Sequence, residues 1–354
     1  MRRIIFTAIA LAVIATTLSL FAASEVKLKR ANGETGDTSP KIAIAYVEWF
    51  RKTLPDPSFF THLIYIGADF NDNCDGVFIP SPDKLRKMSE LKKQNPDLNI
   101  IVGFGDDKKY GFCEMAGDKK KRKSFALSVK NLIDSLNLDG VDLDWEWPTL
   151  AVNGHKATPD DAKNYVSVVK ELRKVLGKDK WISFYSNNKA DYVDVKHMAP
   201  YVDYVNVSGY NLAIPTNDEP SSRHQSPLYP SRKCGEWCIQ EVVERHIARG
   251  VPPEKILVGI PFYGRGREPF PTYVERPLFD KYSEGTHVVW DEDAQAPYYA
   301  DKDGNLVLGF DDERSIKAKF DFIRANNLPG VFVWNYDADY PDHRLAKTIQ
   351  RLRK

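Results

Sequence analysis

The chain has almost no net charge. Lysine and arginine together number 50 and aspartate and glutamate 49, which leaves a formal charge of +1 over 354 residues. The one basic block, Lys119-Lys-Lys-Arg-Lys123, stands where a helix is expected to begin, and we interpret it as a solvated helix face. A nearly neutral chain creates no long-range field that attracts polyanions, so we expect neither nucleic acid nor an anionic membrane as a partner.

Residue patterns typical of metal sites are also missing. The chain has four cysteines and seven histidines, and no histidine stands beside a cysteine at a spacing typical of zinc ligands. The acidic segment 139–146 lacks the glycine-pivoted spacing of a calcium loop. We therefore expect no metal and no cofactor.

The long apolar run of this chain lies at its N-terminus. Two arginines precede an almost wholly apolar stretch that ends at Phe21, and small residues follow it. We interpret residues 1–24 as a signal peptide and residues 25–40 as a flexible leader, with an uncleaved membrane anchor as the alternative. No later stretch is apolar enough to span a membrane, so we expect the mature chain to be secreted or periplasmic.

Export would allow the few cysteines to form disulfides, because disulfides persist in oxidising compartments. Four cysteines permit three pairings. Cys74 and Cys113 follow the second and third expected strands, whose loops should be neighbours, while Cys234 and Cys238 can close a small loop. We predict the pairs Cys74–Cys113 and Cys234–Cys238.

After residue 40, strand-like and helix-like segments alternate, as in βαβ units with a parallel sheet. Helix starts are marked by Thr158-Pro-Asp-Asp161 and by Asp311-Asp312. This alternation predicts an α/β fold, a (β/α)8 TIM barrel, over residues 41–354, and we expect a monomer. The eight strand-like segments lie at 42–47, 62–68, 99–105, 139–146, 181–186, 202–208, 255–262 and 330–335.

Residues 265–310 interrupt this alternation between the seventh and eighth strands. Asp303-Gly304, flanked by Tyr298-Tyr299 and Leu306-Val-Leu308, predicts a β-hairpin. The segment is short, so we expect at most a reduced insertion, and hence an open groove at the barrel mouth.

Residues 138–148, Leu-Asp-Gly-Val-Asp-Leu-Asp-Trp-Glu-Trp-Pro, carry the strongest functional pattern. Side chains alternate along a strand, so Asp142, Asp144 and Glu146 should share one face, while apolar residues occupy the other. Carboxylates placed together repel one another and lose hydration, so the arrangement does not serve folding. A solvated acidic edge strand would not be interleaved with valine, leucine and tryptophan. The segment therefore predicts a functional site.

The octapeptide Asp139-Gly-Val-Asp-Leu-Asp-Trp-Glu146 resembles the D-G-x-D-x-D-x-E motif of glycoside hydrolase family 18, the chitinases and their relatives. The resemblance extends over roughly residues 40–354, and it implies a (β/α)8 barrel with its site at the C-terminal ends of the strands. Further segments resemble the first, second, seventh and eighth barrel strands of the family, namely Lys41-Ile-Ala-Ile-Ala-Tyr46, Thr61-His-Leu-Ile-Tyr65, Ile256-Leu-Val-Gly-Ile-Pro-Phe-Tyr-Gly264 and Gly330-Val-Phe-Val-Trp334.

The resemblance implies a retaining glycosidase that hydrolyses β-1,4 bonds of N-acetylglucosamine polymers such as chitin or chitooligosaccharides. The open groove expected beside residues 265–310 implies that it is endo-acting. Glu146 would act as general acid and base, and Asp144 would position the acetamido group, whose oxygen attacks the anomeric carbon. Asp142 would tune Asp144. The implied substrate-binding residues are Tyr210, Trp334, Asn211, Tyr46 and Asp139, and Tyr210 shares a polar strand face with Tyr204, Asn206 and Ser208.

Some positions depart from the family pattern. Asn211 stands in place of an acid that helps to bind the acetamido group, Gly103-Phe-Gly-Asp106 replaces the family's S-x-G-G, and Trp147 stands where tyrosine is common. A non-catalytic chitin-binding lectin on the same fold is one alternative function, although such lectins typically lose the glutamate that Glu146 represents. A hydrolase of N-glycans or peptidoglycan is the other, because the motif does not distinguish among N-acetylglucosamine polymers.

Overall fold

The computed structural model describes residues 26–31, 40–105, 111–151, 154, 156–213 and 223–354. The predicted signal peptide, most of the leader and Asp106 lie outside the described residues. Within the described ranges, no helix combines the length and apolar character needed to cross a membrane.

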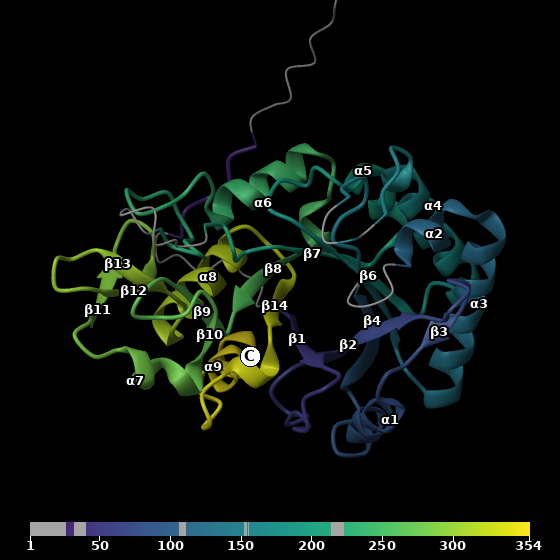
Figure 1. Ribbon diagram of the computed structural model, residues 1–354, viewed down its shortest axis with the longest axis horizontal. Helices are drawn as coiled ribbons and strands as arrows, with labels where there is room; N and C mark the ends of the chain where they lie inside the picture. The colour runs from purple at the N-terminus through teal and green to yellow at the C-terminus, as the bar shows by residue number, and fades with distance from the viewer. Residues whose placement is uncertain (1–25, 32–39, 106–110, 152–153, 155, 214–222) are drawn as a thin grey trace, which may run out of the picture.

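A closed barrel of eight parallel strands forms the centre of the molecule (Figure 1). Around the barrel the order is β1-β14-β8-β7-β6-β5-β4-β2, and β1 pairs with β2 to close it. This confirms the predicted TIM barrel, because every expected strand-like segment contributes one barrel strand. The strands are β1 (Ile42–Glu48), β2 (His62–Phe70), β4 (Asn99–Gly105), β5 (Gly140–Asp144), β6 (Trp181–Ser186), β7 (Tyr204–Val207), β8 (Ile256–Pro261) and β14 (Gly330–Trp334). A short strand, β3 (Val77–Phe78), pairs antiparallel with the end of β2.

Helices pack around the outside of the barrel and bury its apolar outer face (Figure 1). Directly after β5, Trp145 points outward, where its ring stacks on Phe112 at 5.3 Å and meets Tyr165 at 5.2 Å. The basic block forms the first turns of one helix, capped by Asp118. The helices are α1 (Pro82–Glu90), α2 (Phe112–Gly117), α3 (Lys119–Leu136), α4 (Asp161–Leu176), α5 (Val195–Met198), α6 (Ile239–Ala248), α8 (Glu313–Ala325) and α9 (Arg344–Arg353).

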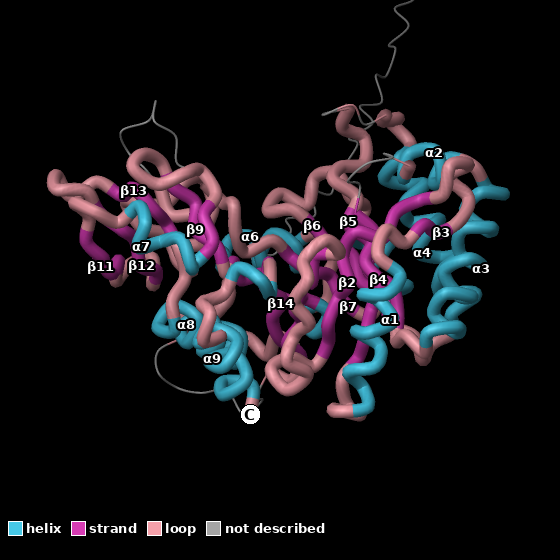
Figure 2. The backbone as a smooth tube through the Cα atoms, turned by 60° about the horizontal axis from the view of Figure 1, so that its bottom comes forward, coloured by secondary structure: helices cyan, strands magenta, loops and turns pink. Residues whose placement is uncertain are grey.

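The segment between β8 and α8 is more than a hairpin. It forms a five-stranded antiparallel sheet in the order β10-β9-β13-β12-β11, which lies to one side of the barrel (Figure 2). The hairpin expected around Asp303-Gly304 is present as β12 and β13. A small apolar cluster around Phe270 and Phe279 fills the space behind this sheet. The elements are β9 (Tyr263–Gly266), β10 (Val274–Glu275), α7 (Phe279–Tyr282), β11 (His287–Asp291), β12 (Ala296–Ala300) and β13 (Leu306–Gly309).

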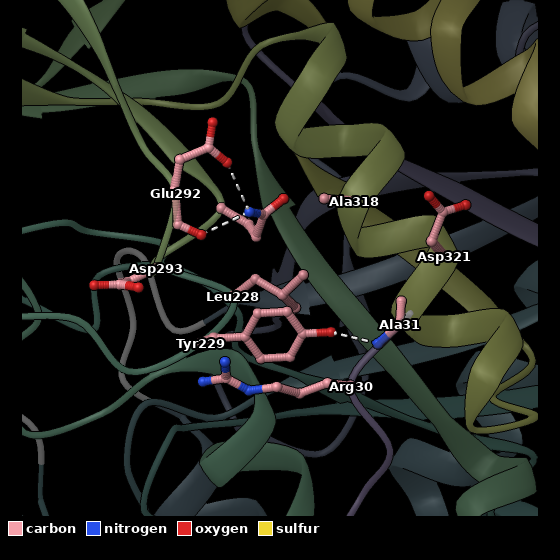
Figure 3. A pocket seen from close by; sticks show the side chains of 9 residues that line it. Arg30, Ala31, Leu228, Tyr229, Glu292, Asp293, Ala318 and Asp321 are labelled. Carbon is pink, nitrogen blue, oxygen red and sulfur yellow. Dashed lines mark hydrogen bonds between the residues drawn. The ribbon is translucent and has the colours of Figure 1, made fainter. Parts of the chain in front are cut away.

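The described part of the leader, residues 26–31, lies against the barrel's helices and loops. The Leu28 amide donates to Glu244 Oε1 at 2.8 Å, and the Ala31 amide donates to the Tyr229 hydroxyl at 2.9 Å. The Arg30 guanidinium lies 4.6 Å from the centre of the Tyr229 ring. Figure 3 shows the hollow beside this contact, about 240 Å³ in volume, which contains none of the predicted site residues.

The structure does not show the predicted disulfides, because no disulfide joins the four cysteines, all of which lie in the described part of the chain. The sulfur of Cys113 lies 3.5 Å from Asp161 Oδ1 at the start of α4. The sulfur of Cys234 accepts from the Ser231 amide at 3.3 Å and lies 3.4 Å from the Tyr229 carbonyl oxygen. These two sulfur atoms therefore lie next to polar groups of neighbouring backbone and side chains.

A fully buried ion pair fastens α8 to the loop that follows β7. Lys319 Nζ donates to both carboxylate oxygens of Asp311 and to the Ser226 hydroxyl, each at 2.6 Å. Neither charged side chain is exposed to solvent. Removing one partner of such a pair leaves an uncompensated buried charge, which is far more costly than the loss of a surface pair.

We therefore expect Lys319→Met to lower the free energy of unfolding by about 3–5 kcal/mol. Lys317→Met on the same helix is the matched control, because Lys317 pairs with Asp321 in solvent, and it should cost less than about 1 kcal/mol. Urea denaturation of the two variants measures the difference. Equal losses would contradict the structural role given to the buried pair.

Candidate active site

Three acidic side chains, two on β5 and one two residues beyond its end, extend from the barrel interior to its mouth. Asp142 is fully buried, Asp144 is 8% exposed, and Glu146 is exposed to solvent. Because strand side chains alternate, the three share the inner face, while Trp145 occupies the outer one. The burial gradient places the most accessible carboxyl group, that of Glu146, at the open end.

Asp142 is surrounded by hydrogen-bond donors from three other strands. The Tyr46 hydroxyl donates to Oδ2 at 2.8 Å, and the Ser183 hydroxyl and the Asn206 amide donate to Oδ1. Asn206 Nδ2 also donates to the Tyr46 oxygen at 2.8 Å. Burial raises the pKa of Asp142 to about 6, although the bonds from Ser183 and Tyr46 act in the opposite direction. Burial likewise raises the pKa of Tyr46, and the nearby Asp142 and Asp144 raise it further.

The glycines of β4 are in register with these carboxylates, and their lack of side chains makes room for isoleucines of β2. Gly103 pairs in register with Asp142, and Gly105 with Asp144. A Cβ atom on Gly103 would lie 2.7 Å from Ile64 Cγ2, closer than packed carbon atoms approach. Gly103 is therefore required where β2 and β4 pack tightly beside the buried acid.

Above Asp142, at the mouth of the barrel, aromatic side chains line a cavity of about 220 Å³. The Trp334 ring, at the end of β14, packs 5.4 Å from the Tyr46 ring beneath it. Burial raises the pKa of Tyr185, and the Glu146 charge raises it further, so its hydroxyl stays neutral and can donate. The lining residues are Asp144, Glu146, Tyr185, Tyr210, Asn211, Tyr263, Arg265, Tyr273 and Trp334.

The insertion provides one wall of this cavity. Asn211 Oδ1 accepts from the Tyr263 hydroxyl and from Arg265 Nε, both at 2.8 Å. Tyr263 stacks on Tyr273 at 4.6 Å, and the Arg265 guanidinium lies over both rings. With its carbonyl oxygen engaged, Asn211 has its amide N–H groups to offer a ligand. The insertion therefore lines one side of the cavity through Tyr263, Arg265 and Tyr273, while the open groove expected at the barrel mouth stays a prediction.

The structure brings the predicted residues Asp144, Glu146, Tyr210, Asn211 and Trp334 together around the cavity, with Tyr46 and Asp142 directly below.

Asp139 does not join this group. It lies before the start of β5, at the opposite end of the barrel, where it pairs with Lys92 at 2.8 Å and accepts from the Ile100 amide at 2.7 Å. The substrate-binding role expected for Asp139 is therefore replaced by a structural one between β4 and β5. Position within the sequence motif did not indicate this, because the strand carries its first and last acidic residues to opposite ends of the barrel.

Four lining residues were not predicted from the sequence. Tyr185 has a signal in the sequence, since Ser183 and Tyr185 place polar groups on one face of β6, as Tyr204 and Asn206 do on β7. Tyr263, Arg265 and Tyr273 come from the insertion, whose fold over the barrel mouth has no local sequence signal. Within the described ranges, no cluster of three or more histidine, cysteine or acidic side chains is arranged to hold a metal ion.

Comparison with known proteins agrees with this geometry. The chain is 26% identical over 328 residues to "Putative chitinase 1" of Margaritifera margaritifera, a match that covers 81% of this chain and 67% of that protein. It is 25% identical over 319 residues to "Chitinase A1" of Niallia circulans, covering 78% of this chain and 45% of that protein. The chain thus spans less than half the length of this second relative.

Solved structures show the same fold. Chitinase ChiW from Paenibacillus sp. str. FPU-7 superposes with a TM-score of 0.79 at 27% identity, covering 88% of this chain and 42% of that one. A family 18 N-acetylglucosaminidase from Paenibacillus barengoltzii superposes with a TM-score of 0.76 at 26% identity, covering 88% of this chain and 99% of that one. The model of the family described as "Glycosyl hydrolases family 18" matches residues 41–339. Since this match spans the whole barrel and its acidic strand, the chain belongs to glycosyl hydrolase family 18.

Proposed function

We propose that this chain is a secreted or periplasmic, retaining glycosidase that cleaves β-1,4 bonds within N-acetylglucosamine polymers such as chitin or chitooligosaccharides. The observation that carries the proposal is the burial gradient of Asp142, Asp144 and Glu146, which ends in a cavity lined by aromatic rings. Flat aromatic faces suit the apolar faces of sugar rings, and carboxyl groups suit proton transfer at a glycosidic oxygen.

Glu146 is proposed as the general acid and base. It stands at the open end of the cavity, where it can reach a leaving oxygen and afterwards a water molecule. The substrate's own acetamido oxygen attacks the anomeric carbon as the glycosidic bond breaks, and Glu146 protonates the departing oxygen. Glu146 then removes a proton from the water that opens the resulting oxazolinium ion, so the configuration is retained after two inversions.

Asp144 is proposed to hold the acetamido N–H and to stabilise the positive charge that develops on the oxazolinium ion. Tyr210 and Asn211 line the same cavity and can donate to the acetamido carbonyl. Trp334 would form the floor beneath the sugar ring, supported by Tyr46. Asp142 lies directly below Asp144, two positions back along the strand, and its charge would influence that of Asp144.

Two alternatives use the same cavity. A lectin would bind the glycan without cleaving it, and the presence of Glu146 at the cavity argues against this reading. Hydrolysis of N-glycans or peptidoglycan would use the same acid and the same acetamido chemistry, so assays on purified substrates must decide among the polymers.

Glu146→Gln keeps the shape of the side chain and removes its transferable proton. We expect hydrolysis of chitooligosaccharides to fall by about 10²- to 10⁴-fold, the usual share of general acid–base catalysis. Binding of chitotetraose, measured by calorimetry, should persist because the aromatic lining is unchanged. Glu90→Gln, at the exposed end of α1, is the control and should leave the rate unchanged. A wild-type chain that binds chitotetraose but cleaves nothing would establish the lectin alternative.

The stereochemistry of the product tests the acetamido nucleophile directly. We expect the first-formed reducing end to be the β-anomer, observed by proton NMR before mutarotation. Asp144→Asn should slow hydrolysis, because the charge of the oxazolinium ion would lose its stabilising carboxylate. An α-anomer as the first product would rule out this mechanism and require a water molecule that attacks directly.

The buried acid predicts a pH-dependent stability. In the folded chain the pKa of Asp142 is about 6, whereas an unfolded chain has an aspartate pKa of about 3.9. The folded state therefore binds more protons between these values, and stability due to Asp142 decreases as the pH rises through them. Relative to Asp142→Asn, the free energy of unfolding of the wild type should fall by about 2 kcal/mol from pH 4.5 to pH 8. A pH-independent difference in urea denaturation would refute the buried titration.

A further inference from the structure

A second groove lies at the catalytic end of the barrel, between the loop after β1 and the start of α1. Its volume is about 480 Å³, roughly twice that of the catalytic cavity. Two large apolar side chains on it are unusually exposed, Phe50 at 54% and Leu54 at 37%. Trp49 lies beside Phe50, with ring centres 5.7 Å apart. Exposed aromatic surface of this kind marks a binding groove.

The charges around this groove are predominantly positive. Arg51, Lys52, Lys84 and Lys87 line it, against the single carboxylate of Asp83. Asp83 is engaged by Arg86, a neighbour on α1, at 2.7 Å. The side chains that line the groove therefore include more cations than carboxylates, while the carboxylates of Glu48, Glu275 and Asp337 lie behind Arg51 and Lys84.

Two of these cations are committed to the protein. Arg51 pairs with Glu48 at 3.2 Å and also contacts Glu275. Lys84 is buried, and its ammonium group donates to the carbonyl oxygens of Glu48 and Arg51 at 2.7 and 2.6 Å. These contacts hold the loop after β1 against α1 and set the shape of the groove.

The other two cations, Lys52 and Lys87, are exposed on the two elements that border the groove. Within the described part of the chain, neither forms an ion pair with an acidic side chain. The N-terminal end of α1 also meets the groove at Ser81, whose side chain makes no cap hydrogen bond. The positive end of the helix dipole therefore has the same sign as the two lysine side chains. These features together favour an anionic ligand with an apolar face.

The wall of the groove contacts a strand that directly follows a residue of the catalytic cavity. Arg51 contacts Glu275 on β10, and Tyr273, two residues earlier, lines the cavity. On the barrel side, Trp49 follows three residues after Tyr46, whose ring supports Trp334.

We propose that this groove binds a carboxylated stretch of an N-acetylglucosamine polymer while neighbouring units occupy the catalytic cavity, so that the chain prefers anionic polymers to neutral ones. The proposal rests on the proposed function and specifies its substrate class. Phe50, Trp49 and Leu54 would contact sugar faces, and Lys52 and Lys87 would attract carboxylates as compact point charges. A deacetylated, positively charged polymer would be repelled, and a neutral one would gain nothing from the two lysines.

The test compares two soluble polymers with the same backbone, carboxymethyl chitin and neutral glycol chitin, as substrates of the full chain. For the wild type we expect a lower KM on carboxymethyl chitin at low salt, and this advantage should shrink as salt screens the charges. The double variant Lys52→Gln/Lys87→Gln should raise KM on carboxymethyl chitin by about three- to tenfold, the expected range for two exposed charges. Its kcat, and its KM on glycol chitin, should stay unchanged.

The matched control is Lys174→Gln/Lys178→Gln, which removes the same charge from exposed positions at the end of α4 and the loop that follows, away from the groove. It should leave the preference intact. Phe50→Ala should raise KM on both polymers, because it removes apolar contact rather than charge.

The outcomes separate the groove from the proposed function. Equal KM values for the two polymers, or equal effects of the two double variants, would overturn the groove assignment while hydrolysis of glycol chitin upheld the function. A lower KM on a sulfated chitin than on carboxymethyl chitin would overturn the choice of carboxylate. If neither polymer is cleaved, the proposed function fails, and affinity electrophoresis in carboxymethyl chitin still decides whether Lys52 and Lys87 bind it.

Discussion

The buried carboxylate of Asp142 is the constraint around which the barrel interior is organised. A carboxylate without solvent requires hydrogen-bond donors, because its desolvation is otherwise far too costly. Tyr46, Ser183 and Asn206 provide these donors from β1, β6 and β7. The network therefore joins strands from different parts of the ring and fixes the height of Asp144 and Glu146 above it. Gly103 allows β2 to pack close beside the same point.

The insertion between β8 and α8 forms one wall of the cavity at the mouth of the barrel. Its first strand, β9, carries Tyr263 and Arg265 to Asn211, so a residue of the β7 loop is oriented by side chains from another subdomain. Several buried polar contacts fasten this wall to the barrel. Gln225 Nε2 donates to the Tyr263 carbonyl at 2.9 Å, and His224 meets Asp291 at 3.1 Å. The Lys319–Asp311 pair fastens the following helix at the same junction. The pocket therefore depends on contacts far from its own strand.

Charge is unevenly distributed over the catalytic end of the molecule. The cavity contains Asp144 and Glu146, while the adjoining groove contains a cluster of lysines and arginine. The two regions meet at Arg51, which is held between Glu48 and Glu275. The cavity has two carboxyl groups beside the guanidinium of Arg265, and the two exposed lysines lie in the groove, so the near-zero net charge does not describe the local charges that a polymer meets at this surface.

Local sequence patterns were enough to predict the barrel and the acidic face of β5, because strand periodicity and helix starts are properties of neighbouring residues. Asp142, Asp144 and Glu146 share a face for the same reason. The donors of Asp142, the roles of Tyr263, Arg265 and Tyr273, and the state of the cysteines depend on residues far apart in the chain. The position of Asp139 at the opposite end of β5 shows that membership of a motif does not determine which end of a strand a residue occupies. Only the closed ring of strands, with the insertion folded over its mouth, decided which side chains meet, because hydrogen bonding and burial act between whatever residues the tertiary fold brings within a few ångströms.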